Sequence, residues 1–313
     1  MDVCLAVKFY INRMIEECGL GMKVLLMDKE TTSIISMVFS QSDMLAKEVY
    51  LFERMDRRTS NEPMKYLKCI AFVRPTEENV ELLQKELRTP KYGQYHLCEY
   101  FTVQVLSMTT ERSFLMNIAD FSNVISKTDV KLLAEADEHE VVRDVQEFYA
   151  DYIAVAPHVF SLNVKDGCYQ TTANTWNPQS LTRCVQGIAS VLLSLKRCPT
   201  IRYQASSEMC KRLAEGVRQV LAKEGSLFTF RSQPQTGSVQ IEMNQQPPVL
   251  LILDRRSDPV TPLLNQWTYQ AMLHELLTIN NNRVDLSHVE GVSKELREVV
   301  ISPEHDDFYK EVR

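Results

Sequence analysis

Two aspartates that follow a strongly apolar segment are the best-placed candidates for chemistry. Asp254 and Asp258 stand in the sequence Leu-Ile-Leu-Asp-Arg-Arg-Ser-Asp-Pro. Carboxylates at the carboxyl end of a parallel strand are where α/β enzymes hold metal ions or sugars. Such carboxylates also accept loop N–H bonds and pair with arginine, and we favour this structural role. The alternative is a metal-dependent α/β enzyme, similar to a sugar transferase, that uses Asp254 and Asp258.

The sequence lacks the other common catalytic motifs. His274 precedes Glu275 as in a zinc-protease helix, but position 278 is Thr, so no second imidazole shares that helix face. Gly19 and Gly21 precede the first expected strand, whereas a dinucleotide fingerprint follows it. No G-x-S-x-G, phosphate-loop or C-x-x-C motif is present. We therefore expect no enzyme, no metal and no cofactor.

Charge and cysteine usage restrict the compartment and the partners. The 313 residues carry 35 Lys+Arg and 41 Asp+Glu, a formal charge of −6, which argues against a nucleic-acid partner. The N-terminus does not resemble a secretory signal, and no apolar run is long enough to span a bilayer. The eight scattered cysteines are typical of reduced thiols in the cytoplasm. We expect a cytoplasmic protein that meets membranes only through its partners.

The segments that must position Asp254 and its neighbours alternate between strand and helix patterns. Thr76 is a plausible N-cap for a helix that begins with two glutamates. Short apolar strands with intervening helices indicate an α/β fold with a largely parallel sheet. We expect strands over Lys23–Asp28, Ser33–Phe39, Val49–Met55 and Tyr66–Val73, an acidic helix over Asp129–Tyr149, further helices from Pro178 and over Ser206–Lys223, and a mobile loop over 232–248.

One stretch of 28 residues is more specific than any of these patterns. Leu250–Leu277 contains a strand ending in Leu-Asp-Arg, a second acid, a Thr-Pro-Leu-Leu turn and a Tyr-Gln-Ala helix. In this order they strongly resemble the signature of the SM (Sec/Munc) family, regulators of SNARE-mediated membrane fusion. The similarity extends to Gly21–Val38, Lys47–Asp56, Glu147–Val155 and Asn265–Ser287.

The resemblance implies an arch-shaped α/β protein of which this chain is a fragment. It implies a parallel-sheet first domain over 1–127, part of a second α/β domain over 128–248, and over 249–313 a strand, a hinge and the truncated start of a mostly helical third domain. The family passes more directly from the Lys-Tyr pair at 91–92 to the Phe-Ser-Asn at 121–123, so 93–119 resembles an insertion. Family members also continue beyond Arg313.

The resemblance also implies the function and the partners. An SM protein binds a syntaxin-type SNARE and templates the assembling SNARE bundle for vesicle docking and fusion, without catalysis. The segments above point to trans-Golgi, endosomal and vacuolar protein transport, with the protein in the cytoplasm and peripherally associated with Golgi and endosomal membranes.

Three groups of residues carry this expectation. A pocket for the syntaxin's N-terminal peptide is expected between the last strand and the following helix of the first domain. A cavity face for the SNARE bundle is expected to use both the first and the third domain. The pocket comprises Val124, Ile125, Val130, Leu132 and Leu133; the cavity face comprises Lys47, Glu53, Arg54, Asn280, Asn281 and Arg283; the structural hinge comprises Asp254, Arg255, Asp258, Pro262 and Tyr269.

Overall fold

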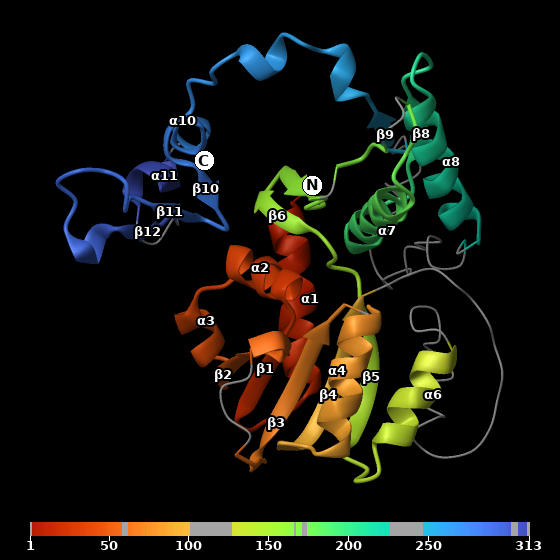
Figure 1. The fold of residues 1–313 in the computed structure, drawn as a ribbon, viewed down its shortest axis with the longest axis vertical. Helices are drawn as coiled ribbons and strands as arrows, with labels where there is room; N and C mark the ends of the chain where they lie inside the picture. Colours follow the sequence, from red (N-terminus) through yellow and green to blue (C-terminus); the bar gives the residue numbers. More distant parts are fainter. Residues whose placement is uncertain are drawn as a thin grey trace, which may run out of the picture. The chain divides into compact units, whose positions relative to one another are not determined.

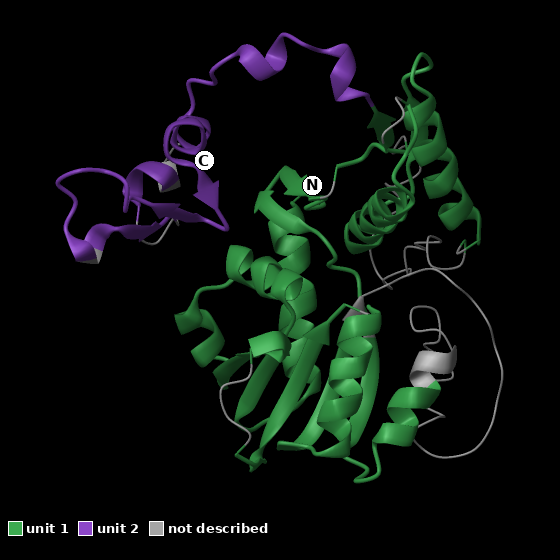
Figure 2. Cartoon of the chain, viewed as in Figure 1, with its two compact units in different colours: residues 1–252 green, residues 253–313 purple. Residues whose placement is uncertain are grey.

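A computed structural model describes residues 2–57, 62–74, 76–100, 127–165, 167–170, 174–223, 225, 247–301 and 306–311. The chain divides into two compact units, Met1–Ile252 and Leu253–Arg313 (Figure 2). Each unit is described by itself.

The first unit is built on a five-stranded parallel sheet with the strand order β2-β1-β3-β4-β5 (Figure 1). This sheet confirms the predicted α/β fold. Its strands are β1 (Lys23–Met27), β2 (Val49–Arg54), β3 (Met64–Val73), β4 (Tyr92–Tyr100) and β5 (Val142–Phe148).

Helices cover both faces of this sheet. Because side chains alternate along a strand, Leu25 and Met27 face one core and Val24 and Leu26 face the other. The first core packs against α1 (Val3–Glu17) and α2 (Lys29–Val38); the second packs against α4 (Glu77–Arg88) and α6 (Lys127–Ala136). The short α3 (Gln41–Leu45) and the 3₁₀ turn η1 (Met55–Arg57) flank β2. The result is a three-layer module.

The strand predicted over Ser33–Phe39 is wrong, because this segment belongs to α2. Asp28 caps the helix: its carboxylate accepts the backbone N–H groups of Glu30 (2.8 Å) and Thr31 (2.7 Å), and Thr31 completes a capping box. Ile34, Ile35 and Val38 then share a buried face. The β-branched composition suggested a strand, but the cap and the helical spacing decide the outcome.

The acidic helix predicted over Asp129–Tyr149 is half correct. The helix α6 stops at Ala136, where Asp137 accepts the backbone N–H groups of Val141 (2.9 Å) and Val142 (3.1 Å). The chain then turns into β5, which pairs with β4 in parallel. The first sheet thus takes its last strand from residues beyond position 127.

The strand β4 begins inside the segment that resembles an insertion. It lies between β3 and β5, so residues 93–100 form part of the sheet, whereas 101–119 lie outside the described residues. Gly93 fits tightly against β3: a Cβ at this position would lie 2.0 Å from the carbonyl oxygen of Lys65. Any side chain there would force the two strands apart.

The rest of the first unit forms a smaller α/β group. A hairpin of β6 (Ile153–Ala156) and β7 (Val159–Ser161) is followed by α7 (Pro178–Ser194), β8 (Thr200–Tyr203), α8 (Glu208–Lys223) and β9 (Val249–Ile252). Strands β8 and β9 pair in parallel, and a separate core around Trp176 and Val217 joins them to both helices. The predicted loop over 232–248 lies outside the described residues except at its last two positions.

The second unit contains helices and a three-stranded antiparallel sheet, β10-β11-β12, that the sequence patterns did not reveal. Val284, Ile301 and Tyr309 form its small buried core. Its elements are η2 (Arg255–Ser257), η3 (Thr261–Leu263), α10 (Tyr269–Leu277), β10 (Ile279–Asn280), β11 (Arg283–Asp285), η4 (Lys294–Leu296), β12 (Glu298–Val300) and α11 (Asp307–Glu311).

A buried carboxylate joins the sheet module to the smaller group within the first unit. Asp151 accepts from Nη2 (2.7 Å) and Nε (3.0 Å) of Arg74, which follows β3, and from Nη1 of Arg183 on α7 (2.8 Å). Its backbone N–H donates to the hydroxyl of Ser190 at 2.9 Å. The Asp151 side chain is 7% exposed, so the two guanidinium groups supply its charge compensation.

Replacing Asp151 with Ala should therefore destabilise the first unit by about 3–5 kcal/mol, because two half-buried guanidinium groups lose their counter-charge. Urea unfolding followed by circular dichroism measures the change. The matched control is Asp56→Ala, which removes an exposed partner of Arg54 and should cost less than about 1 kcal/mol. Equal stability losses in the two variants would contradict the role of Asp151.

Candidate functional site

The carboxyl ends of β1 and β3 are the first place to look for a ligand site. The strand order reverses direction between these two strands, and open α/β sheets bind ligands in the crevice that such a reversal creates. Here the crevice contains residues of the chain itself. The Asp28 carboxylate accepts the backbone N–H of Arg74 (2.7 Å) and the amide of Asn79 (2.9 Å), beside its bonds within α2.

Arg74 contributes both its backbone and its side chain to the contacts at this position. Its backbone binds Asp28 while its guanidinium binds Asp151, so one residue connects the sheet to the segment before β6. Each charged group at this position has a partner of opposite charge or a hydrogen-bond donor within the chain. The arrangement holds parts of the protein together and presents no open carboxylate pair to a substrate.

The signature aspartates are likewise engaged by their neighbours. Asp254 accepts the backbone N–H of Arg256 (3.0 Å) and two bonds from its guanidinium (2.7 and 3.1 Å). Asp258 accepts from Nη1 of Arg255 (3.1 Å) and from the backbone N–H of Thr261 (3.1 Å). The bonds from Thr261 hold the pKa of Asp258 below its ordinary range.

This geometry supports the structural role of the signature. The two aspartates shape consecutive 3₁₀ turns, η2 and η3, and Pro262 lies inside the second. Within the described parts of the chain, no group of three His, Cys, Asp or Glu side chains could hold a metal ion. The metal-enzyme alternative for Asp254 and Asp258 therefore receives no support from the geometry.

The signature also contains a run of exposed apolar side chains that the sequence analysis did not single out. Leu263 and Trp267 are 82% and 90% exposed, and Val260 and Leu264 are also exposed. Their apolar composition was the only signal in the sequence. It could not reveal that these side chains are exposed, because an apolar run is equally typical of a buried segment.

Tyr269 closes the small core of the second unit. Its hydroxyl donates to Oδ2 of Asp306 at 2.7 Å, and its ring meets Phe308 edge-on at 4.8 Å between centroids. This bond lowers the pKa of Asp306 and raises that of Tyr269. Tyr269 thus links the start of α10 to the segment before α11.

The expected cavity-face residues of this unit lie on one hairpin. Asn280 ends β10, Arg283 begins β11, and the two face each other across a two-residue turn. Asn281 and Asn282 occupy that turn with φ of 50° and 60°, as a tight hairpin turn requires and asparagine tolerates. Arg283 binds Glu298 on β12 at 2.6 Å.

The expected cavity-face residues of the first domain lie along the edge strand β2. Lys47 lies just before β2 and Arg54 at its end, so the whole strand separates them. Arg54 binds Asp56 through Nε at 2.9 Å. Glu53 has a different environment, since its carboxylate accepts from Nζ of Lys91 (2.6 Å) and from the hydroxyl of Tyr92 (2.7 Å). Lys91 is 2% exposed, which places Glu53 in a buried brace between β2 and β4.

The expected N-peptide pocket residues lie around α6. Leu133 is buried in the core beneath α4, whereas the neighbouring Leu132 is 39% exposed. Val130 lies on the same helix, and its side chain is not among those described. Val124 and Ile125 lie outside the described residues.

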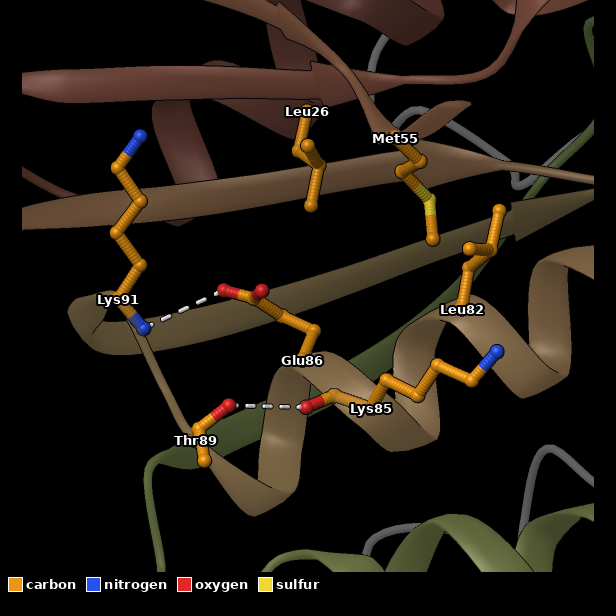
Figure 3. A pocket seen from close by; sticks show the side chains of 7 residues that line it. All are labelled: Leu26, Met55, Leu82, Lys85, Glu86, Thr89 and Lys91. Atoms are coloured by element: carbon orange, nitrogen blue, oxygen red, sulfur yellow. Dashed lines mark hydrogen bonds between the residues drawn. The ribbon is translucent and has the colours of Figure 1, made fainter. Parts of the chain in front are cut away.

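A pocket of about 420 Å³ lies between the sheet and α4, at a place that no motif indicated. Figure 3 shows Leu26, Met55 and Leu82 pointing toward one another, with Glu86 on the same helix as Leu82. Glu86 accepts the hydroxyl of Tyr95 and, at 3.4 Å, the backbone N–H of Lys91. The lining comes from segments far apart in sequence, so only the fold assembles it.

The Tyr269–Asp306 bond leads to a pH-dependent prediction. In Tyr269→Phe the pKa of Asp306 should rise toward its ordinary value, because the carboxylate loses its strongest donor. An NMR pH titration of the Asp306 carboxyl carbon measures this change. Because the folded pKa is lowered, the bond stabilises the fold above the ordinary carboxyl range and loses this effect as the pH falls through the folded value.

Tyr203→Phe on β8 is the matched control, since Tyr203 is exposed in the other unit. An Asp306 titration that is unchanged in Tyr269→Phe would show that the hydroxyl does not hold the carboxylate.

Among the described residues, no helix is both long enough and apolar enough to cross a membrane.

The sequence pattern of the Sec1 family matches residues 23–313. Vacuolar protein sorting-associated protein 45 of Mus musculus is 58% identical over 309 residues, which cover 99% of this chain and 48% of that protein. The same protein of Dictyostelium discoideum is 42% identical over 311 residues, with 99% and 48% covered. The chain thus spans about half the length of the curated relatives it matches.

Solved structures agree with these relatives. The SM protein Vps45 in complex with the Qa SNARE Tlg2 (1–310) superposes with a TM-score of 0.84 and 45% identity, covering 100% of this chain and 51% of that one. The Unc18 chain of the Unc18–syntaxin 1 complex from Monosiga brevicollis gives 0.75 at 23% identity, with 100% and 50% covered, which shows a shared fold. These findings confirm the resemblance seen in residues 250–277, and the chain belongs to the Sec1 family.

Proposed function

We propose that this chain carries the syntaxin-binding half of an SM-type regulator, which binds a Qa SNARE and templates SNARE assembly for vesicle docking and fusion. The pathway that we infer is trans-Golgi, endosomal and vacuolar protein transport, with the protein associated peripherally with those membranes through its partners. The observation that carries the proposal is the superposition, at a TM-score of 0.84, on a Vps45 structure that holds the Qa SNARE Tlg2.

The mechanism that we propose requires binding and no bond chemistry. A template favours the partly assembled SNARE bundle by binding it better than the separate helices, which shifts an equilibrium. The filled position between β1 and β3 supports this view, because the Asp28 carboxylate accepts the backbone N–H of Arg74 and the Arg74 guanidinium binds Asp151. The binding surfaces are then to be sought at sheet edges, turns and outward helix faces.

We propose the edge strand β2 as the cavity face of the first domain. Lys47 lies just before the strand and Arg54 ends it, and Tyr50 between them is 54% exposed. Glu53 supports this face from within through its bonds to Lys91 and Tyr92. On the second unit, the hairpin of Asn280, Asn281 and Arg283 forms the other proposed part of the face. We also propose that the chain comprises a first domain, part of a second domain and the start of a third.

We propose the region around α6 as the pocket for the syntaxin's N-terminal peptide. Of the two pocket residues whose side chains are described, Leu132 is exposed and available for contact, while Leu133 anchors the helix to the core. Val124, Ile125 and Val130 belong to the same proposed pocket. An apolar peptide side chain that meets Leu132 would lie beside a helix that is already fixed on its inner face.

Reversing the charge on both sides of β2 tests the cavity face. The double variant Lys47→Glu and Arg54→Glu should weaken binding to the Qa SNARE Tlg2 (1–310) at least about tenfold, or about 1.4 kcal/mol, and change its salt dependence. Isothermal titration of the 313-residue chain measures the affinity. The control is Arg13→Glu on α1, an exposed arginine paired with Glu17, which should bind as the unmodified chain does. Equal binding by both variants would exclude β2 as the face.

Placing a charge on the outer face of α6 tests the peptide pocket. Leu132→Glu should weaken binding of a synthetic peptide from the Tlg2 N-terminus about tenfold or more, because a carboxylate replaces an apolar contact. Fluorescence anisotropy of the labelled peptide measures this loss. The control is Leu20→Glu, since Leu20 is 88% exposed in the turn between α1 and β1.

Comparing Leu132→Glu with Leu20→Glu distinguishes a specific contact at α6 from a general effect of the added charge. Loss of peptide binding in both would indicate a general charge effect, and loss in neither would remove α6 from the pocket. If the unmodified chain binds neither the peptide nor Tlg2, the proposed function itself fails for this chain.

A further inference from the structure

The pocket between the sheet and α4 combines an apolar wall with a buried carboxylate (Figure 3). Leu26 of β1, Met55 of η1 and Leu82 of α4 form the apolar wall. Glu86 of α4 also lines the pocket and is only 4% exposed. The volume of about 420 Å³ falls within the range of small-molecule sites, about 300–1,000 Å³. A small organic molecule can therefore be accommodated beside Glu86.

The position of Glu86 on α4 is one that packing alone would give to an apolar residue. Val80, Leu83 and Leu87 are the other buried side chains of this helix, and they belong to the core beneath it. A carboxylate at such a position costs stability, because burial removes the water that solvates its charge. The helix thus places a charge at a position where an apolar side chain would avoid this cost.

The contacts of Glu86 fix the direction of its carboxylate. Its Oε1 accepts the hydroxyl of Tyr95 and, at 3.4 Å, the backbone N–H of Lys91. A phenol and a backbone amide are neutral donors. These two bonds therefore orient the carboxylate without neutralising its charge.

The two lysines that line the pocket direct their ammonium groups elsewhere. Nζ of Lys91 donates to Oε1 of Glu53 at 2.6 Å. Lys85 is exposed, and in Figure 3 its side chain extends along α4 toward Leu82. The Glu86 carboxylate lies toward the other end of the pocket, beside the backbone of Lys91 (Figure 3). The pocket thus has an apolar wall and a negatively charged group at one end.

We propose that this pocket binds a small organic amine, whose apolar body lies against Leu26, Met55 and Leu82 and whose ammonium group binds Glu86. A ligand that fills the pocket expels water from around the carboxylate, so the charge then needs a partner of opposite sign. An ammonium group supplies this partner and donates a charge-assisted hydrogen bond. An anionic ligand would bring a second negative charge beside Glu86, and a neutral ligand would desolvate the carboxylate without compensation.

The test uses the purified 313-residue chain with isotope-labelled methionine methyl groups, observed by NMR. The Met55 signal is assigned by its loss in Met55→Leu. The probe is phenylbutylamine, with phenylbutanol and phenylbutyrate as its neutral and anionic analogues. The amine should shift the Met55 signal saturably and bind at least about tenfold more tightly than either analogue, because only the amine pairs with the Glu86 charge.

Two glutamine variants on α4 test whether the charge of Glu86 is responsible for this preference. Glu86→Gln keeps an acceptor oxygen for Tyr95 and Lys91 but carries no charge. In this variant the amine and the alcohol should bind within about twofold of each other. The matched control is Glu81→Gln on the same helix, which should keep the preference for the amine because Glu81 is exposed.

The comparison of the three probes on the unmodified chain decides the proposal even where Glu86→Gln does not fold. A Met55 signal that does not respond to the amine would overturn it, and so would equal binding of the amine and the alcohol. A Glu86→Gln variant that is folded by circular dichroism and still prefers the amine would also overturn it.

Discussion

The buried pairing of one carboxylate with two guanidinium groups sets the architecture of the first unit. Asp151 receives Arg74 from the end of β3 and Arg183 from α7, so three segments far apart in sequence meet at one charge. None of these groups is stable alone in a buried position, because desolvation of an unpaired charge costs several kcal/mol. The sheet module and the group around α7 are therefore mutually dependent, and each completes the ionic environment of the other.

The same network fills the position at which an α/β sheet usually binds a ligand. The crevice where a parallel α/β sheet usually holds its ligand lies between β1 and β3. In this chain Asp28 and Arg74 fill it, and Arg74 extends the network to Asp151. A site whose polar groups already bind one another gains little from a small ligand. The edge strand β2, the outer face of α6 and the hairpin turn of the second unit are the surfaces that we propose for partners.

The fold was predictable where local signals and tertiary packing agree. The strands β1, β2 and β3, the N-cap Thr76 and the helix that begins at Pro178 followed from apolar runs, a capping residue and a proline at the first helical position. Prediction failed at α2, where β-branched residues favour a strand but the Asp28 cap and a buried helical face favour a helix. It also failed at β5, whose charged sequence VRDVQEF gives no strand signal until β4 lies beside it.

In the candidate site, too, contacts between neighbours in the sequence were predictable, whereas contacts between distant segments were not. The sequence identified the signature and assigned Asp254 and Asp258 a structural role, because an acid beside an arginine in a turn is a local pattern. It could not show that Glu53 turns toward Lys91, since that pair forms only when β2 and β4 occupy one sheet. The polar residues of the signature fix two 3₁₀ turns, after which Leu263 and Trp267 stand outward. The motif that identifies the family thus shapes the backbone of this chain, and the direction of these apolar side chains follows from that shape.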